Sequence, residues 1–184
     1  MAKGFNDLVR EQFIYGGKKY ALDTKRESTD QLFDDFGRGW LFGTMAKYCK
    51  RFKNLARERD ILKIACYVYI LWLKKGFHIT QAGLKVDVLD TTVKQKEENF
   101  DLFIKNFDED YNTSFAQVDW YNKKKDELGK HYPVDLIYNE LVAMGRKDWS
   151  KIKLGDLEFI YGNCKMLWEM EYSKVEVHDT DIPK

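Results

Sequence analysis

Apolar residues recur at helical spacing through most of the chain. The clearest stretch, residues 57–77, reads RERDILKIACYVYILWLKKGF: four charged residues, then an apolar run on more than one helical face, then Lys-Lys-Gly. The apolar run is shorter than the ~20 residues needed to cross a bilayer. Acidic residues at its start and lysines at its end agree with the helix dipole. We therefore predict a buried core helix over residues 58–75.

A second helix is predicted immediately before this one. Over residues 40–53, Leu41, Met45, Tyr48 and Phe52 follow one another at spacings of four, three and four, which is typical of one face of an amphipathic helix. The connection KNLAR is short, and short connections join antiparallel neighbours. We predict that the two helices form a central antiparallel hairpin.

Capping residues, glycines and a proline mark the ends of further helices. Alternation typical of a strand occurs in residues 78–89, HITQAGLKVDVL, which favour a loop or a short hairpin. The other predicted helices are residues 3–17, ended by Gly16 and Gly17, 28–37, capped by Ser28 or Thr29, 90–111, 114–129, 133–145 and 153–175.

These elements predict an all-α fold of about seven helices. Residues 1–175 are expected to form a single compact domain built on the hairpin, followed by a flexible tail over 176–184. The alternative is a hairpin lobe, 1–80, and a C-terminal helical lobe, 90–175.

Composition and net charge limit the kinds of binding partner that the protein can have. The chain has 184 residues, of which 44% are hydrophobic and 33% charged, as in ordinary soluble proteins. Its net charge is +1, from 31 basic and 30 acidic residues, so no global field attracts nucleic acid or an anionic membrane. The N-terminus MAKGFNDLVREQF shows no apolar signal segment. We expect a cytoplasmic protein that binds no membrane. Nucleic-acid binding ranks third among the possible functions, because the segments KNLARER and YNKKKDELGK offer only modest local basic patches.

Three cysteines are far apart and form no CxxC motif. They are Cys49, Cys66 and Cys164, a number and spacing that argue against a disulfide framework or a zinc knuckle. We predict that all three are small buried hydrophobic residues.

The most concentrated group of basic residues in the chain extends over both helices of the predicted hairpin. Several of these basic side chains could converge on one phosphate-bearing ligand, with arginine offering bidentate contacts. Ion pairs with the intervening Glu58 and Asp60 would explain the same residues. The candidate ligand-binding residues are Lys47, Lys50, Arg51, Arg59 and Lys63, with Lys18 and Lys19 of the glycine turn.

Residues 14–77 also resemble a known family. The segments IYGGKKYA, GWLFGTMAKYCKRF and LKIACYVYILWL are similar to the N-terminal helical domain of phage dATP/dGTP diphosphohydrolases, relatives of the MazG-like nucleotide pyrophosphohydrolases. The resemblance implies a phage protein in the host cytoplasm that binds a nucleotide, hydrolyses it with Mg²⁺ and forms homo-oligomers. The family usually has histidines where Tyr48 and Lys63 align here.

The magnesium motif of the MazG-like enzymes is only half matched. Their carboxylates follow the pattern ExxE and then ExxD, whereas Glu27-Ser-Thr-Asp30 and Glu98-Asn-Phe-Asp101 fit the second half alone. One such pair supplies two of the oxygen ligands that Mg²⁺ needs. The candidate metal ligands are therefore Glu27, Asp30 and Asp60, and the candidate catalytic residues are Asp60 and Glu58. The alternatives are helix capping by Glu27 and Asp30 and a favourable dipole interaction at Asp60.

Two classes of function remain open. The first is a small phage-type helical protein that binds a nucleotide or another phosphate-bearing ligand, with or without pyrophosphohydrolase activity. The second is a non-catalytic phage accessory protein that binds a host protein, for which the 15% aromatic content would suit a contact surface.

Overall fold

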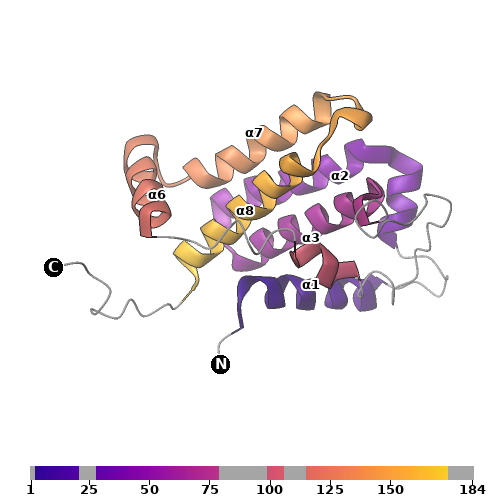
Figure 1. Cartoon of the computed structure of the whole chain (residues 1–184), viewed down its shortest axis with the longest axis horizontal. Helices are drawn as coiled ribbons and strands as arrows, with labels where there is room; N and C mark the ends of the chain where they lie inside the picture. Colours follow the sequence, from indigo (N-terminus) through magenta and orange to yellow (C-terminus); the bar gives the residue numbers. More distant parts are fainter. Residues whose placement is uncertain (1–2, 21–27, 79–98, 106–114, 174–184) are drawn as a thin grey trace.

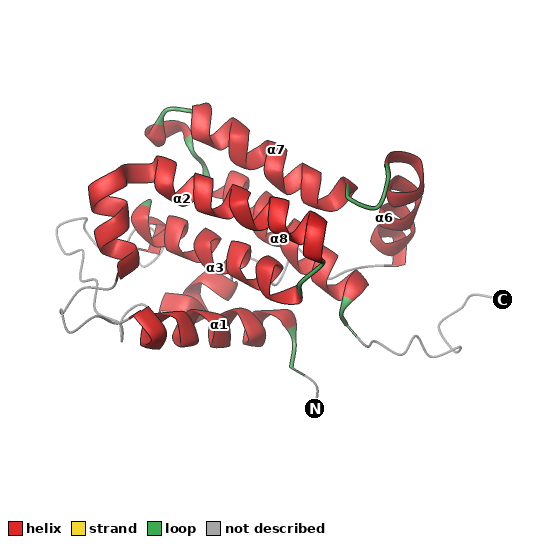
Figure 2. Ribbon diagram, turned by 180° about the vertical axis from the view of Figure 1, so that it is seen from behind, coloured by secondary structure: helices red, strands yellow, loops and turns green. Residues whose placement is uncertain are grey.

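The described part of the chain is all-helical. The computed structural model describes residues 3–20, 28–78, 99–105 and 115–173, and it contains no strand within those ranges (Figure 2). This confirms the predicted all-α class. The elements are α1 (Phe5–Tyr20), α2 (Ser28–Leu55), α3 (Glu58–Lys74), α6 (Phe115–Leu128), α7 (Tyr132–Arg146), the 3-10 helix η1 (Trp149–Lys151) and α8 (Leu154–Glu171).

Helix α3 is buried on several sides, which accounts for its apolar residues on more than one face. It packs against α1, α2 and α8 (Figure 1). Tyr69 illustrates the enclosure, because its ring lies 5.1 Å from Phe13 of α1 and 5.0 Å from both Phe100 and Phe103 of the helical residues 99–105. The buried residues of α3 are Asp60, Ile61, Leu62, Ile64, Ala65, Cys66, Val68, Tyr69, Leu71 and Trp72.

Helices α2 and α3 run antiparallel along one another. Three contacts show this direction: Arg51 with Asp60, Tyr48 with Lys63, and Trp40 with Tyr67. Residue numbers therefore increase along α2 while the numbers of their partners in α3 decrease. The residues between them include Ala56, which has a φ of 47°. Its carbonyl accepts a 2.7 Å hydrogen bond from the Tyr172 hydroxyl, which ties the connection to the residue after α8.

Helix α2 differs from the prediction because it joins the two helices expected over 28–37 and 40–53. The junction is a bend at Gly37, whose φ of 69° and ψ of −166° are non-helical and lie in a region that essentially only glycine adopts. On the N-terminal side of the bend, the Phe33 ring lies 5.9 Å from the Trp149 ring. Gly37 therefore interrupts the helical path without ending the helix.

Helix α1 also departs from the prediction, which ended it at Gly16 and Gly17. It continues to Tyr20, so the prediction of a glycine stop was wrong. A glycine inside a helix costs about 1 kcal/mol relative to alanine, a penalty that the packing of α1 on α3 can offset.

The second half of the chain covers the hairpin. Helix α7 packs against α2 and α8, and α8 packs against α3. Helix α6 lies at one end of the bundle and crosses the direction of α7 (Figure 1). None of the described helices is long and apolar enough to cross a membrane. Most of the predicted loop or hairpin 78–89 and the tail 176–184 lie outside the described residues.

Candidate functional site

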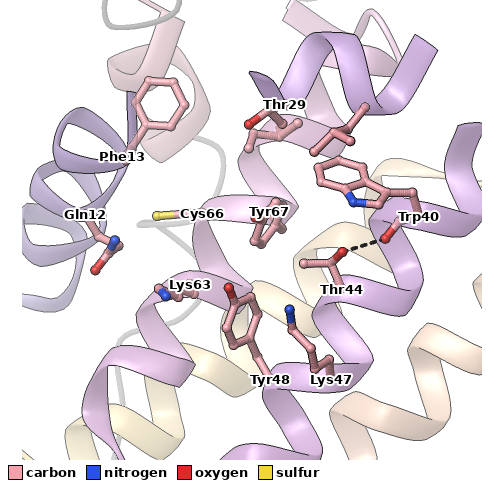
Figure 3. Close-up of a pocket in the computed structure, with 13 residues that line it drawn as sticks. Gln12, Phe13, Thr29, Trp40, Thr44, Lys47, Tyr48, Lys63, Cys66 and Tyr67 are labelled. Atoms are coloured by element: carbon pink, nitrogen blue, oxygen red, sulfur yellow. Dashed lines mark hydrogen bonds between the residues drawn. The ribbon is translucent and has the colours of Figure 1, made fainter. Parts of the chain in front are cut away.

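A cavity of about 290 Å³ opens between α1, α2 and α3 (Figure 3). We call it the lysine cavity, after the two lysines in its wall. Its lining residues are Gln12, Phe13 and Gly16 of α1, Thr29, Leu32, Trp40, Thr44, Lys47 and Tyr48 of α2, and Lys63, Cys66, Tyr67 and Ile70 of α3.

Helical spacing brings these side chains to one place. On α2, Trp40, Thr44 and Lys47 are separated by four and three residues, so they share a face. On α3, Lys63 and Tyr67 are one turn apart. Because α2 and α3 are antiparallel, these two stripes face one another across the cavity.

Lys47 and Lys63 are the charged residues of the cavity. Their ammonium groups lie 5.1 and 4.9 Å from the centroid of the Tyr48 ring, on either side of that ring in Figure 3. The two charges are therefore no more than about 10 Å apart, the sum of those distances. Neither lysine forms an ion pair with a carboxylate in the part of the chain that the structure describes.

Aromatic rings form the wall beside the lysines. Tyr67 stacks on Tyr48, with their ring centroids 6.0 Å apart and an interplanar angle of 21°. The Trp40 ring meets Tyr67 edge-on at 6.0 Å. The Thr44 hydroxyl donates a 2.7 Å hydrogen bond to the Trp40 carbonyl oxygen (Figure 3). Tyr48 thus presents its ring both to another aromatic residue and to two cations.

Arg51 and Asp60 form an ion pair outside the lining of the cavity. Arg51 Nε lies 3.6 Å from Asp60 Oδ1. The Asp60 carboxylate is fully buried, and neither of its oxygens has a hydrogen-bond partner among the described residues. Asp60 also lies in the first turn of α3, where the helix dipole favours a negative charge. These two residues link α2 to α3.

Asp60 is poorly suited to bind a metal in this arrangement. The Arg51 guanidinium already occupies a cationic position beside its carboxylate, and a second cation there would be repelled. No group of three or more His, Cys, Asp or Glu side chains that could hold a metal ion occurs within the described residues. The side chains of the other candidate ligands, Glu27 and Asp30, lie outside them.

Glu58 also has a structural partner. Its Oε1 accepts a 2.7 Å hydrogen bond from the indole Nε1 of Trp168 on α8. A buried indole N–H usually requires such an acceptor. Glu58 therefore joins the start of α3 to α8, and it does not line the lysine cavity.

The remaining basic candidates do not all share the cavity. Lys50 lies over the Tyr138 ring of α7, 5.6 Å from its centroid, and Arg59 is exposed at the start of α3. The backbones of Lys18 and Lys19 lie in the last turn of α1, but their side chains are outside the described residues. Of the predicted ligand-binding residues whose side chains are described, Lys47 and Lys63 line the cavity.

The three cysteines are buried and free, as predicted. Cys66 lines the cavity, where its thiol donates to the Val9 carbonyl oxygen at 3.3 Å. Burial raises the pKa of the Cys66 thiol, and the charge of Lys63 lowers it by a smaller amount. Burial also raises the pKa of Cys49 to about 12. Both thiols are therefore protonated at neutral pH and poorly nucleophilic.

The aromatic and polar walls of the cavity were missed by reasoning that followed charge alone. Trp40, Thr44 and Tyr67 carry no charge, and Gln12 belongs to a different helix. A usable signal was nevertheless present. The residues one turn from Lys47 and Lys63 toward the cavity are polar or aromatic, and a stripe of this kind beside the apolar core face indicates a lined pocket.

Comparisons with family models, with curated proteins and with solved structures find no match to this chain.

Proposed function

We propose that this protein binds a small phosphate-bearing ligand in the lysine cavity, and that a nucleotide fits the cavity best. The observation that carries this proposal is the convergence of Lys47 and Lys63 from two helices on one ring in the cavity wall. Charge-assisted hydrogen bonds from lysine to phosphate are among the stronger polar contacts in proteins. The aromatic side chains next to the lysines supply surfaces on which a planar base can stack.

We propose binding only. Hydrolysis would require groups at the cavity that activate water, whereas Asp60 pairs with Arg51 and Glu58 accepts from Trp168. The resemblance to nucleotide pyrophosphohydrolases supports a nucleotide as the ligand and leaves catalysis to a direct assay. Incubation with nucleoside triphosphates and Mg²⁺, followed by measurement of released pyrophosphate, provides that assay.

Calorimetric titration of nucleotides into the unmodified protein and three variants tests the binding site. Lys47→Gln and Lys63→Gln each remove one charge from the cavity. A charge-assisted contact contributes about 1.5–3 kcal/mol, so each variant should weaken binding roughly ten- to a hundredfold. Lys50→Gln is the matched control, because it removes the same charge from the same helix but lies over Tyr138 of α7.

The variants separate a localised site from a diffuse attraction. If Lys50→Gln weakens binding as much as the two cavity variants do, the positive surface as a whole attracts the ligand and the site is wrong. If no nucleotide binds the unmodified protein at millimolar concentration, the proposed function is wrong. Thermal unfolding of each variant checks that its fold is retained.

A second candidate function is binding to another protein or to a second copy of the chain. Helix α6 favours it, because Trp120 and Leu128 on this helix are 43% and 61% exposed and exposed apolar side chains are enriched in contact surfaces. Sedimentation of the unmodified chain over a range of concentrations tests self-association. Dissociation of any oligomer by Leu128→Glu would place the contact on α6, whereas an unchanged oligomer would exclude this helix.

A further inference from the structure

The lysine cavity has two chemically different ends. Figure 3 shows Lys63, Tyr48 and Lys47 at one end, and Phe13, Thr29 and Trp40 toward the other, with Tyr67 between them. Two of the three residues at the second end have aromatic rings. A ligand that fills the cavity should therefore be anionic at one end and flat or apolar at the other.

The charge at the first end matches one phosphate group. A phosphate monoester carries about −1.5 to −2 charges near pH 7, and Lys47 and Lys63 provide two positive charges on either side of Tyr48. The described lining includes no carboxylate that would oppose this anion. A triphosphate would bring additional negative charge, which usually requires Mg²⁺ held by protein carboxylates.

The volume of the cavity also favours a ligand with a single phosphate. Its volume of about 290 Å³ is near the lower limit of the range for small-molecule sites, roughly 300–1,000 Å³. A single ring system with one phosphate suits that volume better than an extended polyphosphate chain does.

The part of the cavity away from the lysine ammonium groups has aromatic rings, and a side-chain amide also lines the cavity (Figure 3). The rings of Trp40 and Tyr67 meet edge-on at 6.0 Å and both line the cavity, and any nucleobase can stack on an aromatic ring. Gln12 of α1 lines the same cavity, and its amide can both donate and accept hydrogen bonds, as the edge of a nucleobase does.

We infer that the lysine cavity takes a nucleoside monophosphate, with the phosphate held by Lys47 and Lys63 and the base placed against Trp40 and Tyr67. This inference rests on the proposed function, which requires only that the ligand carries phosphate. It adds that one phosphate is sufficient and that the base contributes to affinity. It also predicts that Mg²⁺ is not required for binding.

Calorimetry with a set of related ligands tests the inference. The set comprises the four common nucleoside monophosphates, adenosine, inorganic phosphate, and ATP with and without Mg²⁺. At least one monophosphate should bind about tenfold or more tightly than adenosine and inorganic phosphate, and no less tightly than ATP in either condition.

A tryptophan variant tests the position of the base. Trp40→Leu should weaken monophosphate binding about five- to a hundredfold, the loss expected when a stacking surface is removed, and should leave inorganic phosphate unaffected. Trp120→Leu is the matched control, because Trp120 is on α6 and does not line the cavity. Equal losses in the two tryptophan variants would overturn the placement of the base.

The outcomes separate the inference from the function on which it rests. Tighter binding of ATP by tenfold or more would overturn the monophosphate class while leaving phosphate binding in place. Equal binding of inorganic phosphate and of the best monophosphate would show that the base makes no contribution. Failure of every phosphate-bearing ligand to bind would overturn the proposed function itself.

Discussion

The bend in α2 can be tested by adding one methyl group at Gly37. This residue has a φ of 69° and a ψ of −166°, and a side chain in that region costs about 1–3 kcal/mol. A Cβ built on Gly37 would meet no atom within 4 Å. Any destabilisation by Gly37→Ala would therefore come from the backbone conformation and not from a steric clash.

Gly39 provides the matched control two residues further along α2. A Cβ at Gly39 also meets no atom within 4 Å, and Gly37 is the position at which α2 departs from helical angles. Gly39→Ala should therefore stabilise the fold by about 0.5–1 kcal/mol, as alanine does inside a helix. The free energies of unfolding of the two variants should differ by roughly 1.5–4 kcal/mol.

Urea denaturation followed by far-UV circular dichroism measures this difference. If Gly37→Ala is as stable as Gly39→Ala, residue 37 adopts ordinary helical angles in solution and the bend is wrong. The bend also matters for the cavity, because Thr29 and Leu32 in its wall precede Gly37 on the same helix. We therefore expect Gly37→Ala to weaken ligand binding and Gly39→Ala to leave it unchanged.

Three further predictions concern the core, the buried ion pair and the thiols. Leu71→Ala empties a fully buried position and should lower the free energy of unfolding by about 2–5 kcal/mol. Leu55→Ala, at a half-exposed leucine, should lower it by under ~1 kcal/mol. Similar losses of stability for the two variants in urea denaturation would show that α3 is not in the core. Arg51→Met should lower the free energy of unfolding by about 1–3 kcal/mol, because it leaves the Asp60 carboxylate without its ion pair. In an Asp60→Asn background the same substitution should lower it by under ~1 kcal/mol. Equal losses of stability in the two backgrounds would mean that the ion pair is not formed. Cys49 has a pKa of about 12 in the fold against an ordinary 9.0, so the native state holds the thiol proton more tightly than the unfolded state does. The stability that this proton contributes is therefore complete below pH 9.0 and is lost as the pH rises toward 12. Urea midpoints at pH ~8 and ~10 measure this loss of stability, and a Cys49→Ala variant should lose less stability over the same range.

The position of α3 was predictable because its apolar residues occupy more than one helical face. The segment 58–75 could bury several faces only as an enclosed helix, and α3 (Glu58–Lys74) is enclosed. The glycines were less informative. Gly16 was expected to end a helix and does not, whereas Gly37 bends one. A glycine permits a break in a helix, and tertiary packing decides whether the break occurs.

The candidate site was only partly predictable, because like charges near one another in sequence can face different neighbours. Lys47 and Lys50 are three residues apart on α2, yet Lys47 lines the cavity and Lys50 lies over Tyr138 of α7. Which of them faces α3 and which faces α7 depends on how these two helices pack around α2. Spacing along one helix carries no information about that arrangement.

The basic cluster divides between Arg51, which has an ion-pair partner, and Lys47 and Lys63, which line the cavity and for which ligand binding is proposed. One turn of the paired helices joins Arg51 to Asp60, and the neighbouring turn places Lys47 and Lys63 around Tyr48. Arg51 has an acidic partner, so its charge is offset within the fold and removing it should affect stability. The two lysines have an aromatic ring between them, which keeps both charges close to the cavity without neutralising either. If the proposed ligand binds, its negative charge would lie near two cations whose positions the α2–α3 packing already determines.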